Sequence, residues 1–167
     1  MGRHNIELVA WIIGFATILG MSRIIPHPPN FTPILAVAIF IPFLVNKWYA
    51  ALPITLGAMF IGDLYWGLHQ WLFWTYGSVA LCSFIASYSK NLMTNSVLAP
   101  VTFFIVTNFG VWTGGWYGYT LEGLFACYVA AIPFFHMTLL GTIFYTAIFY
   151  GLYYITKKYG KSLQKTV

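Results

Sequence analysis

Residues 6–25 read IELVAWIIGFATILGMSRII, a nearly unbroken apolar run that decides the class of the fold. A helix needs about 20 such residues to cross the roughly 30 Å hydrocarbon core of a bilayer. The segment PHPPN at residues 26–30 ends the run, because proline lacks the amide hydrogen and restricts the residue before it. No small-residue cleavage site follows, so we interpret the run as a retained transmembrane helix and not as a signal peptide.

The composition of the whole chain also indicates a membrane protein. Of the 167 residues 60% are hydrophobic and 7% are charged, and the mean hydropathy is +0.77. A soluble domain has a charged fraction of about a quarter, so an ordinary soluble domain is excluded. The net charge of +5 does not indicate nucleic-acid binding, because the basic residues flank apolar runs.

Five further apolar runs predict an all-α integral membrane protein with six transmembrane helices in one bundle. The expected spans are residues 6–25, 31–45, 48–66, 71–88, 96–112 and 133–155. Before the last span, Pro133 interrupts an apolar stretch that is longer than one crossing requires. We therefore expect a separate short helix over residues 121–132, lying in the outer leaflet. No repeat or soluble segment is visible, so residues 1–167 are expected to form a single domain.

The basic residues predict the orientation of this bundle. Seven of the eight Lys and Arg residues fall at the same ends of the spans, which the positive-inside rule makes cytoplasmic. These seven are Arg3, Lys47, Lys90, Lys157, Lys158, Lys161 and Lys165. We expect a multi-pass protein of a prokaryotic cytoplasmic membrane with both termini in the cytoplasm. The outer face keeps Arg23, His27, Asp63, His69 and Glu122, so the functional site is expected there.

Arg23 and Asp63 are the strongest site candidates on that face. Arg23 is the one basic residue on the side that the positive-inside rule disfavours, and arginine can clamp a carboxylate or a phosphate with two hydrogen bonds. Asp63 lies well inside an apolar segment, where a carboxylate is costly and is usually paired or lines a polar cavity. Two readings stay open: the two residues form a structural ion pair, or they contact a substrate, a cation or a proton. Snorkelling of Arg23 to lipid headgroups is a further alternative.

Other polar and aromatic residues of the outer face complete the predicted binding site. His27, Asn30 and Asn108 are expected to supply hydrogen bonds to a ligand. Trp112, Trp116 and Tyr117 flank a glycine-rich loop, and we expect them to cover the ligand, since aromatic side chains combine a large apolar area with a polar atom. An ordinary interfacial aromatic belt is the alternative for these three residues.

No cofactor or metal is predicted. His27, His69 and His136 raise the possibility of a haem or metal site, but no cysteine or second carboxylate stands at ligand spacing from them. Cys82 and Cys127 lie in apolar stretches without CxxC spacing, so we interpret both as packing residues. The sequence also lacks GxSxG, HExxH and phosphate-loop motifs, which argues against an enzyme.

Three segments resemble the signature of a family of small, uncharacterised prokaryotic membrane proteins. They are RIIPHPPNFTPILA at residues 23–36, GD at residues 62–63 and NFGVW at residues 108–112. That family in turn resembles the substrate-binding S components of energy-coupling-factor transporters, over nearly the whole chain. The resemblance implies a six-helix protein that takes up a vitamin or similar micronutrient from the outer face, assisted by a transmembrane coupling protein and two ATPases.

Small residues of the first helix are the candidate contacts with such a partner. In S components, small residues on that helix contact the coupling protein, and Ala10, Gly14, Ala16 and Gly20 are the corresponding residues here. Internal helix packing explains them equally well. The leading hypothesis is thus a substrate-capture subunit without ATPase activity of its own. The alternatives are a structural or accessory subunit of a larger membrane complex and an intramembrane redox protein.

Overall fold

The computed structural model describes the backbone of residues 3–163 and the side chains of residues 9–158, and all regular structure within this range is helical. The helices are α1 (Arg3–Ile24), α2 (Ile34–Val45), the short 3-10 turn η1 (Trp48–Ala50), α3 (Leu52–Trp66), α4 (Leu72–Tyr88), α5 (Leu92–Thr113) and α6 (Leu121–Leu163). The prediction of an all-helical chain is confirmed. Two of the predicted basic residues, Arg3 and Lys161, have no described side chain, and Lys165 lies outside the described residues.

The predicted break at Pro133 is wrong, because residues 121–132 and the last predicted span form one continuous helix, α6. A proline inside a helix removes one backbone hydrogen bond, so contacts on both sides of it must favour the continuous helix. The ring of Phe104 in α5 supplies such contacts. Its centroid lies 5.4 Å from Tyr128, before Pro133, and 4.9 Å from Phe135, after it.

The second and third predicted spans begin later than the sequence indicated. α2 begins at Ile34, after the prolines of the preceding loop, and ends at Val45, where the left-handed backbone of Asn46 (φ 57°) caps it. Pro42 lies inside α2 and is buried. Trp48 belongs to the 3-10 turn, and α3 begins only at Leu52. α2 is therefore a 12-residue helix, shorter than a bilayer crossing requires.

The buried core lies where α2 crosses α3 and α4. Ile39 of α2 and Val79 of α4 are fully buried there, with Ala58 of α3 beside them. α1 packs on α3 through small residues: a Cβ at Gly57 would lie 3.3 Å from the Cβ of Ala16. Close approach of this kind is typical of helix pairs with small residues at their interface.

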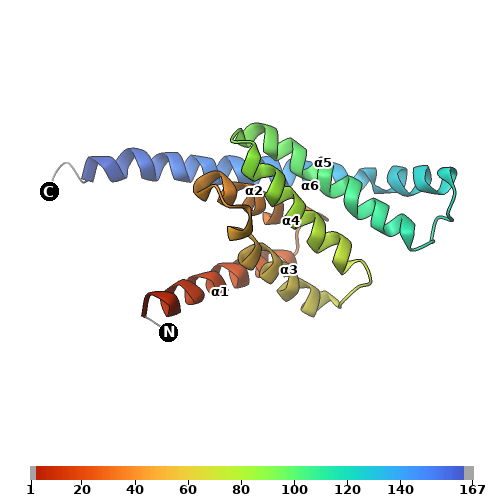
Figure 1. Cartoon of the computed structure of the whole chain (residues 1–167), viewed down its shortest axis with the longest axis horizontal. Helices are drawn as coiled ribbons and strands as arrows, with labels where there is room; N and C mark the ends of the chain where they lie inside the picture. The colour runs from red at the N-terminus through yellow and green to blue at the C-terminus, as the bar shows by residue number, and fades with distance from the viewer. Residues whose placement is uncertain (1–2, 164–167) are drawn as a thin grey trace.

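The connections between helices separate into two ends of the molecule. Figure 1 shows the turns after α2 and α4 toward the end where α1 begins and α6 finishes. The connections between α3 and α4 and between α5 and α6 lie toward the other end. Lys47, Lys90, Lys157 and Lys158 belong to the first end, which we call the basic end. Arg23 finishes α1 and Asp63 lies in the last turns of α3, so both lie away from it.

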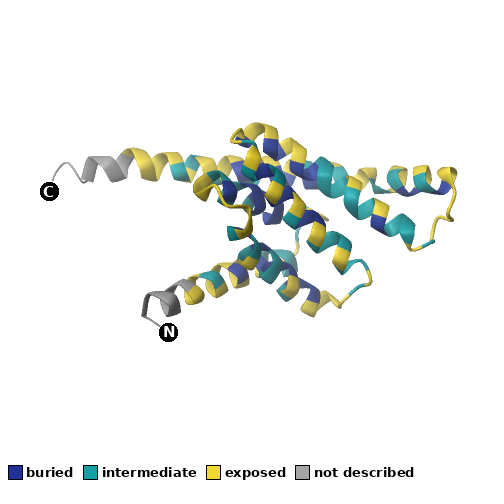
Figure 2. Cartoon of the chain, in the orientation of Figure 1, coloured by how far each residue is buried: buried dark blue, intermediate teal, exposed yellow. Residues whose placement is uncertain are grey.

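Most of the helical surface is apolar and exposed. Two helical segments, Leu92–Thr113 and Leu121–Lys158, are long and apolar enough to cross a membrane by length and composition. Only 22% of the most apolar window of each is buried. Figure 2 shows exposed residues along α5 and along much of α6. Three further segments, Val9–Ile24, Ile34–Val45 and Leu72–Tyr88, are shorter apolar helices.

Candidate functional site

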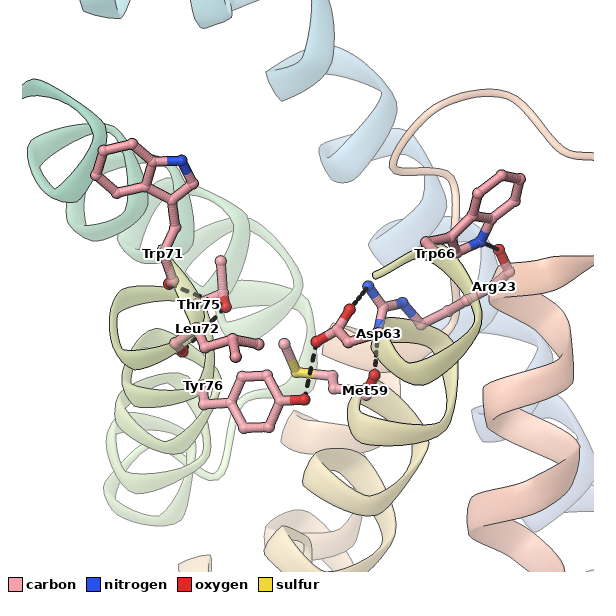
Figure 3. A network of polar contacts seen from close by, with 8 residues as sticks. All are labelled: Arg23, Met59, Asp63, Trp66, Trp71, Leu72, Thr75 and Tyr76. Atoms are coloured by element: carbon pink, nitrogen blue, oxygen red, sulfur yellow. Dashed lines mark hydrogen bonds and ion pairs between the residues drawn. The ribbon is translucent and has the colours of Figure 1, made fainter. Parts of the chain in front are cut away.

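The ion pair between Arg23 and Asp63 is the central feature of the candidate site. Nη2 of Arg23, at the end of α1, donates to Oδ1 of Asp63 in α3 at 2.8 Å. The carboxylate side chain is 3% exposed and the arginine side chain 23% exposed. Of the alternatives that the sequence left open, the structure therefore shows pairing of the two residues. Headgroup snorkelling is not the arrangement seen, because the guanidinium lies against α3 (Figure 3).

Three further hydrogen bonds fix this pair. Tyr76 of α4 donates its hydroxyl to Oδ2 of Asp63 at 2.8 Å, so both carboxylate oxygens accept a bond. Nη1 of Arg23 donates to the carbonyl of Met59, and Nε1 of Trp66 donates to the carbonyl of Arg23 at 3.1 Å. Figure 3 shows Tyr76 approaching the carboxylate from the side opposite to the arginine. The network joins α1, α3 and α4, and Arg23 still has unused N–H donors out of its five.

Gly62 makes room for the guanidinium on the surface of α3. A Cβ at this position would lie 2.8 Å from Nη1 and 3.1 Å from Cζ of Arg23. The terminal atoms of an arginine can move aside in general, but here they are held by Asp63 and Met59. The pair of residues 62 and 63 therefore works as a unit, with the glycine admitting the arginine that neutralises the acid.

We expect Gly62→Ala to weaken the ion pair and to lower stability. The displaced arginine costs about 1–3 kcal/mol as an overpacked site, partly offset by the helix propensity of alanine of about 1 kcal/mol. Gly14→Ala in α1 is the matched control, because a Cβ there meets no atom within 4 Å. Thermal unfolding in detergent should give a lower midpoint for Gly62→Ala than for Gly14→Ala. Equal midpoints would show that Arg23 does not depend on Gly62.

A cavity of about 300 Å³ opens beside the ion pair. Arg23 lines it together with His27, Asn30 and Thr32 of the connection between α1 and α2. Apolar side chains complete the wall, among them Met59, Val79 and Phe103. The imidazole Nδ1 of His27 lies 2.6 Å from the carbonyl of Ile25, which orients the ring. Asp63 is not among the residues that line this cavity.

A second cavity of about 150 Å³ adjoins the first. Asn30, Phe103 and Thr138 line both cavities. The second cavity also contains Asn108, whose Nδ2 donates to the carbonyl of Phe104 at 2.8 Å and whose amide oxygen can still accept a bond. Asn30 stands in the left-handed region (φ 64°), which asparagine tolerates better than most residues. Its side chain therefore lies at the junction of the two cavities.

The two cavities can hold a small polar molecule by charge and hydrogen bonds. A guanidinium, an imidazole, two amides and three threonine side chains line them, from α1, α5, α6 and the first connection. Aromatic rings of α5 and α6 supply apolar area, as in most small-molecule sites. Within the described residues, no three His, Cys, Asp or Glu side chains come together in a way that could hold a metal ion.

The aromatic residues expected to cover the ligand lie elsewhere. Trp112, Trp116 and Tyr117 line neither cavity. Trp112 packs on Phe109 and Tyr119 at the far end of α5, and Trp116 is 78% exposed in the connection that follows. Figure 1 shows this connection at the tip of the α5 and α6 pair, away from the end of α1. The arrangement does not bring these three residues to Arg23, so their covering role stays a prediction.

The small residues of α1 divide into two pairs. Ala16 and Gly20 face α3: both are buried, and a Cβ at Gly20 would lie 2.9 Å from the side chain of Ile61. Ala10 and Gly14 are exposed, and a Cβ at Gly14 meets nothing within 4 Å. Internal packing thus uses the first pair and leaves the second pair on the surface.

Sequence reasoning missed three residues that shape the site: Gly62, Tyr76 and Thr138. A signal for Thr138 exists, because threonines recur every four residues along α6, at Thr138, Thr142 and Thr146, and all three are buried. A spacing of four residues places side chains on one face of a helix. No sequence pattern distinguishes Tyr76 from the other tyrosines. Gly62 was named only as part of the GD segment at residues 62–63, without a role of its own.

A family model described as "Family of unknown function (DUF6580)" matches residues 3–163. The searches of curated proteins and of solved structures give no match. The matched range includes every residue of the ion-pair network and of both cavities.

Proposed function

We propose that this chain, which belongs to the DUF6580 family of unknown function, is the substrate-binding subunit of a membrane uptake system. Its ligand is a vitamin-like or other small micronutrient that enters from the outer face of a prokaryotic cytoplasmic membrane. The observation that carries the proposal is the pair of cavities between helices, with an arginine and two asparagine side chains in their walls. Ionisable side chains within apolar helices usually pair with one another or face a polar cavity, and Arg23 does both.

Three observations support the membrane placement. The two longest helices expose most of their apolar surface, unlike the core helices of soluble proteins. Large apolar side chains are exposed along every α-helix of the described part. Lys47, Lys90 and Lys157 gather at one end of the molecule, as the positive-inside rule requires of the cytoplasmic side. In this placement both termini are cytoplasmic and the cavities open toward the outer side.

The walls of the cavities suggest the chemistry of the ligand. Arg23 keeps donors after pairing with Asp63, so it can bind a carboxylate or another acceptor on the ligand. Asn30 and Asn108 offer amide donors and acceptors, while the rings of Phe103 and Phe104 offer apolar faces. A compact molecule with an acceptor at one end and a flat apolar part fits this distribution. Its volume is bounded by the two cavities of about 300 and 150 Å³.

The resemblance to S components adds a transmembrane coupling protein and ATPases as partners. The chain itself carries no phosphate-loop motif, so ATP hydrolysis is assigned to the partners. Ala10 and Gly14 remain exposed on α1 and permit close approach of a partner helix. We assign the contact to these two residues, because Ala16 and Gly20 already pack against α3.

A structural or accessory role in a larger membrane complex is the second candidate. It is favoured by an apolar groove of about 690 Å³ between α1, α2 and α6, with Phe15, Phe40 and Phe149 in its walls. A groove of this kind suits a helix of another subunit. A stoichiometric partner that is neither a coupling protein nor an ATPase, together with empty outer cavities, distinguishes this role from substrate capture.

Native mass spectrometry of protein solubilised gently from its membrane tests the leading proposal. We expect the parent protein to carry a bound small molecule and the Asn30→Gly variant to lose most of it. The loss of one hydrogen bond between the ligand and Asn30 should lower the affinity by about tenfold. Glycine keeps the left-handed backbone of residue 30 and removes only the amide. The matched control is Asn46→Gly, at the other left-handed asparagine, which caps α2 at the basic end.

The control separates ligand binding from backbone effects. Asn46→Gly should retain the bound molecule at the parent level. Loss of the molecule from both variants, or retention by both, would contradict the assignment of the ligand to the cavities beside Asn30. Equal unfolding midpoints of the two variants show that any difference in occupancy arises at the site.

A further inference from the structure

Another cavity, of about 870 Å³ and distinct from the three described above, lies at the basic end, far from the ion pair. Its lining residues come from α2, from the beginning of α5 with the turn before it, and from α6. The wall is largely apolar and contains Phe43 of α2, Met93 of α5, and Ile143 and Tyr150 of α6. Gly151 also lines it, and a Cβ at this glycine would meet no atom within 4 Å. We call this cavity the basic-end groove.

One edge of the groove is electrostatically positive, because Lys90 and the N-terminus of α5 lie there. Lys90 lines it from the turn between α4 and α5 and is exposed. α5 begins two residues later, and its first amides point out of the helix without partners in the helix itself. Asn91 caps the helix by accepting from the amide of Thr94, which leaves the amides of Leu92 and Met93. A lysine beside a helix N-terminus favours the binding of a phosphate group.

A buried hydroxyl without a partner supplies an independent indication of a ligand. Thr138 and Thr142 of α6 donate to the carbonyls of Phe134 and Thr138, four residues earlier. Thr146 lines the groove, is 4% exposed, and its hydroxyl has no hydrogen-bond partner among the described residues. A buried hydroxyl without a bond costs about 1–3 kcal/mol. Across the groove, Ser96 is buried and its oxygen can still accept a bond.

We propose that the basic-end groove binds one anionic phospholipid of the cytoplasmic leaflet. The phosphate lies at Lys90 and the N-terminus of α5, an ester or hydroxyl of the glycerol part bonds Thr146, and an acyl chain lies along the apolar wall between α5 and α6. The inference rests on the proposed membrane placement, in which the basic end is cytoplasmic. It does not depend on the micronutrient site, which lies in other cavities.

The distribution of polarity in the groove favours a lipid over a free anion. A free phosphate would use only the edge at Lys90 and would leave the apolar wall and Thr146 uncovered. A phospholipid matches both parts, because it joins an anionic head to an apolar chain. Basic pockets between membrane helices on the cytoplasmic side bind anionic headgroups for this reason.

The test measures lipid binding to delipidated protein in detergent by native mass spectrometry. The probes are phosphatidylglycerol and phosphatidylcholine with the same acyl chains, added to the parent and to three variants. We expect the parent to bind one phosphatidylglycerol about five- to tenfold more tightly than phosphatidylcholine, the contribution of one lysine and a helix N-terminus. Lys90→Gln should remove most of this preference. Gly151→Leu, which places a side chain in the groove, should weaken binding of both lipids.

Lys47→Gln is the matched control, because Lys47 is exposed in the other turn at the basic end and does not line the groove. It should leave the preference unchanged. Equal losses in Lys47→Gln and Lys90→Gln would overturn the proposal by showing diffuse attraction to charge. Competition by inorganic phosphate together with unchanged binding in Gly151→Leu would also overturn it, in favour of a free-anion site. Binding of the small molecule at Asn30 is read from separate spectra of gently solubilised protein, so the two proposals fail separately.

Discussion

Arg23→Met is expected to lower the free energy of unfolding by about 3 kcal/mol, toward the lower end of the range for removing one partner of a buried ion pair. The carboxylate of Asp63 is 3% exposed, so without the arginine it would remain buried with only Tyr76 as a neutral partner. The lower end of the range applies because the arginine side chain is 23% exposed, which lets solvent screen the pair. The unfolding midpoint in detergent should fall by roughly 6–12 °C.

The double variant Arg23→Met/Asp63→Leu distinguishes the loss of the pair from the loss of arginine packing. Replacing both charged partners by apolar side chains leaves no unpaired charge and is often close to neutral in stability. We therefore expect the double variant to recover most of the midpoint lost by Arg23→Met. A double variant as unstable as the single one would mean that the stem of Arg23, and not its charge, stabilises the bundle.

Gly110→Ala is expected to produce the second large effect, at the contact between α4 and α5. A Cβ at Gly110 would overlap Cγ of Trp74 and would lie 2.7 Å from its Cβ. These atoms stand next to the backbone of α4, so rotation of the tryptophan ring does not relieve the overlap and the two helices must separate. Overpacking costs typically 1–3 kcal/mol, and we expect about 3 kcal/mol here, measured as a fall in the unfolding midpoint.

Gly77→Ala provides the control for this steric argument. Gly77 lies in α4, three residues after Trp74, and a Cβ there meets no atom within 4 Å. Alanine has a higher helix propensity than glycine by about 1 kcal/mol, so this variant should be as stable as the parent or more so. A fall of similar size in both variants would show that α4 and α5 do not approach as closely as Gly110 implies.

Part of the candidate site could be predicted because charge in an apolar chain is rare. Arg23 and Asp63 stood out in the sequence, and the structure pairs them. Asn30 and Asn108 were also singled out, and both line the second cavity. The aromatic residues after α5 were assigned to the same site by their composition alone. The composition of a segment does not predict where the connection between two helices lies in space. In the structure, Trp116 lies in the connection between α5 and α6, away from the cavities.

The ends of the helices were predictable only where a local signal acts. Asn91 caps α5 with its side chain and the helix begins at Leu92, yet the predicted span began four residues after Leu92, at Ser96, because only apolar length was considered. Pro133 carries a strong local signal for a break, and that signal was overridden. The competing effect is the packing of Phe104 on residues before and after the proline, and such contacts are invisible in a local pattern.

The sequence by itself determined that the regular structure of the described residues is helical, and that basic residues such as Lys47 and Lys90 lie apart from Arg23 and Asp63. Apolar runs, prolines and charges act over a few residues, so their consequences can be predicted one segment at a time. Only the tertiary structure decided that Asp63 accepts bonds from Arg23 and Tyr76, which come from two other helices. The free energy of the buried Asp63 carboxylate depends on Arg23 and Tyr76, which are 40 and 13 residues away in the chain. Only the folded structure brings these two side chains within hydrogen-bonding distance of it.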